Sequence, residues 1–204
     1  MTTCNIEYVG SHDFTLKYGS FLIIIEVITC GRPLGEKIQE GWMMTMRRPK
    51  REIKDMAEIC KVIDECSVCR IGLCDKGGVY IVPMNFGYLR EDRKLTFYLH
   101  SARVGRKIEV LKENPDIGIE LDCRHGLVSA DKPCSHSFCF ASLIGTGRAV
   151  IEEDAKEKLK ALKVIMKHQT GKDFDNFDEK WINAVAVIKV ELREYACKHH
   201  DGTN

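Results

Sequence analysis

The sequence has no surplus of charge of either sign. Its 31 lysine and arginine residues nearly balance 30 aspartate and glutamate residues, which leaves a formal net charge of +1. Broad electrostatic capture of nucleic acid needs an excess of cations on one face, so this balance argues against a nucleic-acid-binding protein. The balance is still compatible with a small, local anion site.

The sequence also lacks a hydrophobic run long enough to cross a bilayer, which takes about 20 apolar residues. Its most apolar stretch, FLIIIEVI at residues 21–28, is interrupted by Glu26 and lacks the flanks of a signal peptide. We therefore expect no membrane contact. Residues 21–28 could form an added strand. Alternatively, residues 1–45 are poorly ordered sequence upstream of a start between Met43 and Met46, which is the interpretation that we adopt.

Several familiar motifs are missing as well. The chain contains neither a Walker A phosphate loop nor an HExxH zinc motif. Gly145-Thr146-Gly147 resembles the start of a dinucleotide fingerprint, but the third glycine is absent. A strand pattern also follows these glycines, where the fingerprint requires a helix. The sequence therefore predicts no dinucleotide site at this position.

Cysteine, in contrast, is abundant, with ten residues. The chain is longer than typical disulfide scaffolds, and several cysteines fall in apolar patterns where the residue acts as a small hydrophobe. We therefore expect reduced thiols and a cytoplasmic protein. A metal site built on Cys66-Ser67-Val68-Cys69 and other Cys and His residues is an alternative. Because the paired spacing of a zinc ribbon is missing, we predict no metal ligands.

The apolar pattern predicts a mainly β (α+β) protein. At 204 residues the chain is long enough for one domain with its own core. Alternation and turn residues predict six strands with few helices, although this pattern alone does not distinguish a barrel from a sandwich. The expected strands cover residues 70–74, 79–87, 95–100, 116–122, 138–152 and 184–192. The expected helices cover residues 51–65, a short segment after Gly105, and residues 154–168.

The stretch from residue 79 to residue 115 carries the clearest chemical signal. Gly105, Arg106 and Lys107 open a short helix, and Pro115 follows its expected end. A helix N-terminus offers unpaired N–H groups, arginine can hold a phosphate through two parallel hydrogen bonds, and lysine adds a compact charge. These residues fit a phosphate site, and they fit a solvated, positively charged turn equally well.

The order of several motifs along the chain is informative. They are MRR at 46–48, CRIGL at 69–73, PMNFGY at 83–88, FYLHSARVGRK at 97–107, ENP at 113–115 and ASLIGTGRA at 141–149. In this order the motifs resemble the pyridoxamine 5′-phosphate oxidase-like split-barrel flavoproteins, and among these the 5-nitroimidazole-resistance proteins. The resemblance covers residues 46–193.

The resemblance implies an architecture and a set of domain limits. Residues 46–195 are expected to form a six-stranded antiparallel split β-barrel with peripheral helices. Residues 1–45 do not match and are treated as an extension, while residues 196–204 show no pattern and are expected to form a mobile tail. Relatives are homodimers with flavin at the subunit interface, so a homodimer is implied as well.

The resemblance also implies a flavin cofactor, with FMN expected and FAD as the alternative. The phosphate and ribityl end of the flavin would be held by His100, Ser101, Arg106 and Lys107. Its ring would be lined by Pro83, Met84, Asn85, Phe86 and Ser142, with one of Met84 and Phe86 expected in the core. Ala141 departs from the pattern, because relatives often carry arginine there.

The activity that the resemblance implies is the reduction of a small molecule of the nitroaromatic or 5-nitroimidazole type. The flavin would carry the redox chemistry, and His100 would be the catalytic proton donor. Two alternatives remain at this stage. One is a flavin-binding or flavin-sensing protein without turnover, and the other is a metal-binding module built on the cysteines and histidines.

Overall fold

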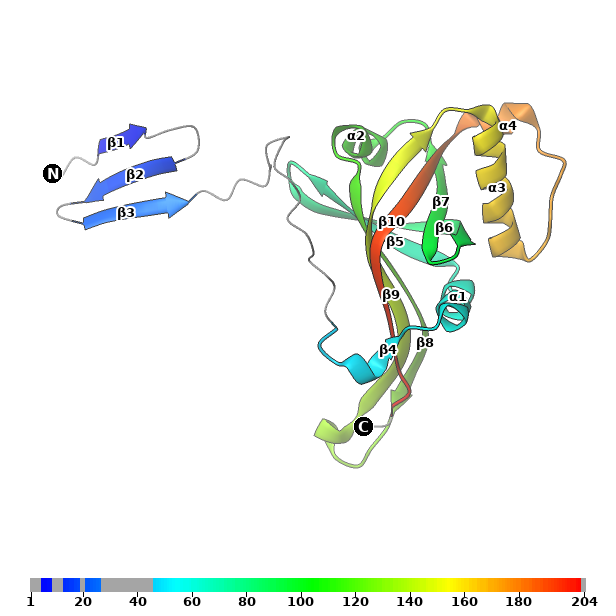
Figure 1. Ribbon diagram of the computed structural model, residues 1–204, viewed down its shortest axis with the longest axis horizontal. Coiled ribbons are helices and arrows are strands. Elements are labelled where there is room, and N and C mark those ends of the chain that lie inside the picture. The colour runs from blue at the N-terminus through cyan, green and yellow to red at the C-terminus, as the bar shows by residue number, and fades with distance from the viewer. Residues whose placement is uncertain (1–4, 9–12, 19–20, 27–45, 203–204) are drawn as a thin grey trace. The chain divides into compact units, whose positions relative to one another are not determined.

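The computed structural model describes residues 5–8, 13–18, 21–26 and 46–202, and the chain divides into two units, residues 1–41 and 42–204. In the first unit, β1 (Asn5–Tyr8), β2 (Asp13–Tyr18) and β3 (Phe21–Glu26) form an antiparallel sheet in chain order (Figure 1). Residues 21–26 are therefore in a strand. The limit at residue 45 stays a prediction, and Met43 lies outside the described residues.

The second unit is built on a seven-stranded antiparallel sheet in the order β4-β10-β7-β6-β5-β8-β9. Because β9 also pairs with β10, six of these strands close into a barrel, as predicted (Figure 1). The seventh strand is β4, which has two residues and pairs only with β10. The bounds are β4 (Glu52–Ile53), β5 (Val68–Asp75), β6 (Gly78–Glu91), β7 (Lys94–Ala102), β8 (Asp116–Val128), β9 (Ser137–Glu152) and β10 (Val185–His200).

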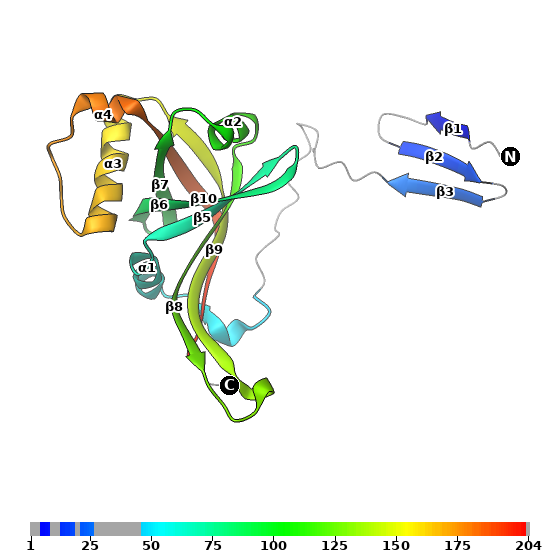
Figure 2. The ribbon, with the colours of Figure 1, turned by 180° about the vertical axis from the view of Figure 1, so that it is seen from behind.

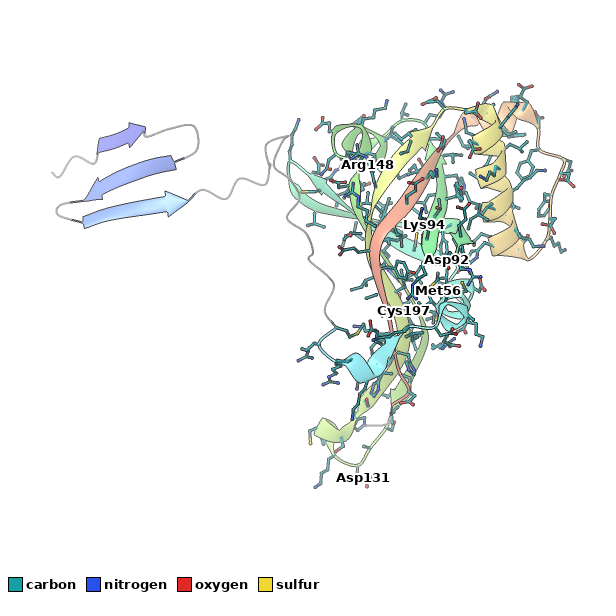
Figure 3. The ribbon with its side chains drawn as sticks, in the orientation of Figure 1. Met56, Asp92, Lys94, Asp131, Arg148 and Cys197 are labelled. Carbon is teal, nitrogen blue, oxygen red and sulfur yellow. The ribbon has the colours of Figure 1, made fainter. Side chains whose placement is uncertain are left out.

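Alternation along the strands fills the barrel. On β7, for example, Leu95, Phe97 and Leu99 are almost fully buried in the main core, while Tyr98 on the opposite face is buried in a second cluster with α3. The hairpin between β5 and β6 turns at Lys76-Gly77, as the sequence predicts. The turn between β6 and β7 consists of Asp92 and Arg93, and Asp92 is labelled in Figure 3.

β6 changes its neighbour halfway along its length, and this change opens the barrel. Residues 78–85 pair with β5, whereas residues 86–91 pair with β7. On β7, residues 100–102 pair with β10 and no longer with β6. The two strands therefore part between Asn85 and His100. Pro83 lies in the half of β6 that pairs with β5 alone and has a free edge on the β7 side, where a residue without an N–H group is tolerated.

Helices cover the outside of the barrel. They are α1 (Met56–Asp64), α2 (Arg106–Glu113), α3 (Ala155–Thr170) and α4 (Glu179–Ala184), with short 3₁₀ turns η1 (Pro49–Arg51) and η2 (Pro133–Ser135). The Asp154 carboxylate caps α3 by accepting from the N–H of Glu157 (3.0 Å), and Gly171 ends it at φ 70°. α3 lies over β6 and β7 (Figure 2). Within the described residues, no helix is long and apolar enough to span a membrane.

The C-terminal prediction is wrong in one respect. The last strand was expected to stop at residue 192 and to be followed by a mobile tail from residue 196, but β10 continues to His200. A bulge between Leu192 and Glu194 shifts the register, after which the strand pairs with β9 as far as Phe140 and with β4. Cys197, which Figure 3 labels, is paired with Ile53 and is buried. The extra residues are held by two neighbouring strands.

Candidate functional site

The opening between β6 and β7 is where most of the candidate residues gather. Among the strands that the structure describes, residues 78–85 of β6 have no neighbour on the β7 side, and residues 100–102 of β7 have none on the β6 side. Strand edges of this kind present unpaired backbone N–H and C=O groups. The opening therefore provides hydrogen-bonding groups for a planar ligand without any change in the barrel.

The β6 candidates split between two faces. Pro83 and Asn85 are exposed, whereas Met84 and Phe86 are buried in the main core. The sequence led us to expect one of the last two in the core, and the structure places both there. A ligand in the opening could meet Met84 and Phe86 only through their backbone.

Asn85 is fixed by the end of α3. Its side-chain amide donates to the Ser67 carbonyl (3.0 Å) and to Oε1 of Gln169 (3.2 Å). Gln169 in turn donates to the carbonyls of Ser67 (3.0 Å) and Phe86 (2.8 Å). These four bonds lie at the point where β6 leaves β7, so they hold one margin of the opening in place.

On β7, alternation separates His100 from Ser101. His100 is exposed, whereas Ser101 is buried and its hydroxyl donates to the Ala102 carbonyl (2.8 Å). Two neighbouring residues of a strand face opposite sides, so only His100 presents its side chain outward. The side chain of His100 forms no hydrogen bond or ion pair with the part of the chain that the structure describes.

The predicted Arg106–Lys107 pair does open a helix, α2, after Gly105 at φ 123°, a backbone angle that favours glycine. Arg106, however, is already occupied. Its Nε donates to the Asp75 carboxylate (2.8 Å), and its guanidinium lies 4.2 Å from the centre of the Tyr80 ring. The hydrogen bond from Arg106 lowers the pKa of Asp75, so the ion pair persists at neutral pH and is lost only in acid.

Lys107 is the available cation at this corner. It is partly exposed in the first turn of α2, and it forms no ion pair with any described residue. No described carboxylate is paired with its ammonium group, and Glu109 is the acidic residue of the same first turn. Around the same opening, Val79 and Ile81 on β6 and Val104 before α2 are unusually exposed apolar side chains.

Ser142 is not brought together with the other candidates. It lies on β9, where it pairs with Asp122 on one side and Lys198 on the other, and it is buried. His100 pairs with Val187, which precedes Lys198 by eleven positions on the same strand, β10. Eleven residues of strand span about 36 Å at about 3.3 Å per residue. Ser142 and His100 of one chain therefore lie in different parts of the barrel.

A hollow of about 860 Å³ lies between α1, β6 and α3, and no sequence pattern predicted it. Within it the Tyr88 hydroxyl donates to the Asp64 carboxylate (2.9 Å), and burial raises the pKa of Tyr88. The His168 ring packs against the Phe86 ring at a tilt of 36°, with centroids 4.4 Å apart. The residues that line this hollow come from elements that are distant in sequence, so no motif indicates the hollow. The candidate flavin residues line neither this hollow nor three smaller ones among the described residues, of about 610, 230 and 90 Å³.

The sequence profile of the protein family described as pyridoxamine 5′-phosphate oxidase matches residues 55–199. No curated protein matches the chain. Among solved structures, a protein of Bacteroides thetaiotaomicron VPI-5482, provisionally assigned to 5-nitroimidazole antibiotic resistance, is 36% identical with a TM-score of 0.63. The match covers 72% of this chain and 86% of that one.

Two further solved structures share the fold at lower identity. The flavocytochrome Anf3 of Azotobacter vinelandii is 23% identical with a TM-score of 0.63, and the match covers 76% of this chain and 72% of that one. An FAD- and heme-binding protein of Mycobacterium smegmatis is 15% identical with a TM-score of 0.62, and the match covers 74% of each chain. At these identities the likeness concerns the fold alone.

Proposed function

Because this chain belongs to the pyridoxamine 5′-phosphate oxidase family, we propose that it is an FMN-binding oxidoreductase that reduces small nitroaromatic molecules of the 5-nitroimidazole type. The observation that carries the proposal is the opening between β6 and β7 with Lys107 at its corner. Unpaired strand edges suit a flat, hydrogen-bonding ring, and a free lysine at a helix N-terminus suits a phosphate.

The residues present fit a flavin in three respects. Lys107 and the first N–H groups of α2 would hold its phosphate. The backbone of Pro83 and Asn85 would face its ring, and the exposed Val79 and Ile81 would supply apolar cover. Arg106 fits less directly, since Asp75 and Tyr80 already engage it, so we assign it to positioning the first turn of α2.

A bound flavin would supply the electrons for the reduction. The protein would supply protons and orientation, because a nitro group that gains electrons accumulates negative charge. His100 is exposed at the margin of the opening and is the titratable side chain that β7 presents there. We assign proton donation to its imidazole. FAD in place of FMN would use the same ring contacts.

We also propose that the protein acts as a homodimer with the flavin at the subunit interface. Ser142 lies too far along the barrel to share a ligand with His100 of the same chain, but a partner chain could bring its own copy into reach. The exposed apolar side chains Val79, Ile81 and Val104 around the opening offer a surface for that partner.

A reducing compartment, such as the cytoplasm, is consistent with the cysteines. Burial raises the pKa of Cys69 to about 12 and also raises that of Cys66, so these thiols are unreactive at neutral pH. Cys134 is exposed and unbridged, and such thiols persist in reducing surroundings. We therefore assign the protein to the cytoplasm.

One observation favours a second candidate function. Within one chain, the described candidate residues line none of the four hollows named above, so none of these would take a substrate next to the flavin. A protein that binds flavin without turnover would need none. Steady-state reduction of a nitroimidazole by the flavin-loaded protein, with a chemical electron donor, distinguishes the two functions.

The phosphate assignment is tested by removing one charge at a time from α2. We expect Lys107→Gln to weaken flavin binding by about 10- to 100-fold, the effect of one lost charge-assisted hydrogen bond. Lys112→Gln, in the last turn of the same helix, is the matched control and should bind flavin normally. Flavin content is read from the visible absorption spectrum, and mass spectrometry of the released cofactor distinguishes FMN from FAD.

Two outcomes would reject the assignment. A full-length wild-type protein that binds no added flavin would reject the cofactor itself. A Lys107→Gln protein with wild-type affinity would place the phosphate elsewhere on the chain.

A further inference from the structure

A second cationic region lies between η1 and the C-terminal end of β10, well away from α2. A hollow of about 610 Å³ lies against the η1 residues and the last residues of β10, and a second of about 230 Å³ adjoins it. Both hollows are lined by Arg48 and Arg51, so they lie side by side. We call the two together the basic hollow. Its volume falls in the range of roughly 300–1,000 Å³ that is usual for small-molecule sites.

The walls of the basic hollow carry a strong excess of positive charge. Five arginine and lysine side chains line it: Arg47, Arg48, Lys50, Arg51 and Lys198. The lining carboxylate among the described residues is Asp201. None of the five cations forms an ion pair within residues 46–202. Cations gathered within one Debye length repel one another, and a bound anion relieves that repulsion.

The Arg51 side chain of the basic hollow is held in place by a buried histidine, His200. Arg51 donates to Nε2 of His200 (3.2 Å), because a guanidinium has no acceptor, and the Ser137 hydroxyl contacts the same nitrogen (2.8 Å). His200 is only 7% exposed, so this support is buried. The Arg51 guanidinium is thereby oriented before any ligand arrives, which lowers the entropy that binding must overcome.

The hollow also has an aromatic wall. Phe140 of β9 lines it, and the Lys198 ammonium lies 5.3 Å from the centre of the Phe140 ring. The His200 ring meets Phe140 edge-on, with centroids 6.3 Å apart. A partly exposed ring beside cations is suited to a ligand that joins an anionic group to a flat ring.

We propose that the basic hollow binds the pyrophosphate group of a nucleotide, with its base or ribose against Phe140. A single phosphate can be gripped by about two arginines, which would leave the remaining cations without an anion. Two linked phosphates match the larger number of cations and the two adjacent hollows. The proposal rests on the hollow alone and does not require the flavin site.

The test measures binding of inorganic pyrophosphate and of ADP to the full chain by titration calorimetry. We expect both to bind, and we expect Arg47→Gln/Arg48→Gln to weaken both by about 100-fold, since two charge-assisted contacts are lost. That double variant leaves the Arg51–His200 contact intact. Arg93→Gln, an exposed arginine in the β6–β7 turn, is the matched control and should bind as the wild type does.

A second variant distinguishes a nucleotide from free pyrophosphate. Phe140→Leu keeps an apolar side chain on β9 but removes the ring, so it should weaken ADP and leave pyrophosphate unchanged. Equal loss of both ligands, or of neither, would overturn the nucleotide assignment. Loss of flavin from the Arg47→Gln/Arg48→Gln protein would show that the hollow belongs to a partner's flavin site, and would also overturn the proposal.

Discussion

At the scale of single residues, the direction of each side chain on β7 decides which groups can meet a ligand. His100 faces outward, and Ser101 turns inward and satisfies its hydroxyl on the Ala102 carbonyl. Motifs place these two residues side by side, yet their side chains lie on opposite faces of the strand. His100 is therefore the residue of this pair that can exchange a proton with a bound molecule.

His100→Gln should separate binding from catalysis. Glutamine keeps a polar side chain of similar reach but cannot donate a proton, so we expect normal flavin content and a 10²- to 10⁴-fold slower reduction of a nitroimidazole, as is typical for a lost general acid. The measurements are flavin occupancy and kcat with a chemical electron donor. His136→Gln, at an exposed histidine beside η2, is the control. A His100→Gln enzyme as fast as the wild type would remove His100 from the mechanism.

Single-residue roles were predictable only where motif and backbone agree. Gly105 before α2 was predictable, because the chain needs a positive φ there and a helix follows. The ion pair and the ring contact of Arg106 were not predictable, because its partners Asp75 and Tyr80 come from the β5–β6 hairpin. No local pattern reports a contact between residues 31 positions apart.

At the scale of elements, the close approach of α3 to β6 depends on one small residue. A Cβ on Gly87 would lie 2.5 Å from the Val164 carbonyl oxygen and 2.7 Å from Cα of Ile165. Both are backbone atoms of α3, so no side chain can swing away to make room. The helix can therefore pack at its present distance only if residue 87 has no side chain.

Gly87→Ala should destabilise the fold by about 1–3 kcal/mol, the usual cost of forcing an added carbon into a packed contact. The free energy of unfolding is measured by denaturant titration. Gly72→Ala is the matched control, because its Cβ would meet nothing nearer than the Gly118 oxygen at 3.9 Å. That control should be neutral or slightly stabilising, since alanine restricts the unfolded chain. Equal stability of the two variants would mean that α3 shifts freely on the sheet.

Strands with regular alternation were predictable from sequence, and their extensions were not. The six barrel strands and the turn at Lys76-Gly77 follow from apolar alternation and glycine. β10 was cut short in the prediction because Arg193 and Glu194 interrupt its pattern. The bulge at that point restores pairing beyond the interruption, which only the partner strands reveal.

At the scale of the whole molecule, one chain provides two separate parts of the candidate site. The opening between β6 and β7 holds most of the candidate residues, and Ser142 lies far along β10 from it. Chain order does not show this separation, because strands distant in sequence become neighbours only when the barrel closes. The family resemblance indicated the candidate residues, and the strand register shows which of them lie close together within one chain.

Ile81→Lys should disrupt the proposed homodimer. Ile81 is 61% exposed on the outer face of β6, and a buried lysine at an apolar contact is costly. We expect the wild type to have the mass of two chains by light scattering, and the variant to have the mass of one chain and less bound flavin. Trp181→Lys, at a residue 68% exposed on α4, is the control and should stay dimeric. A dimeric Ile81→Lys protein would place the interface elsewhere.

The pairing of β10 has a consequence for how the protein is made. β10 joins β7 to β9 and also holds β4, so it is the element that completes the ring. A ribosome delivers residues 185–200 after all the other barrel strands. Until then the nascent chain has two strand edges with unpaired backbone groups, one on β7 and one on β9, because β10 is their native partner. The barrel can therefore close only after the last of its strands has been synthesised.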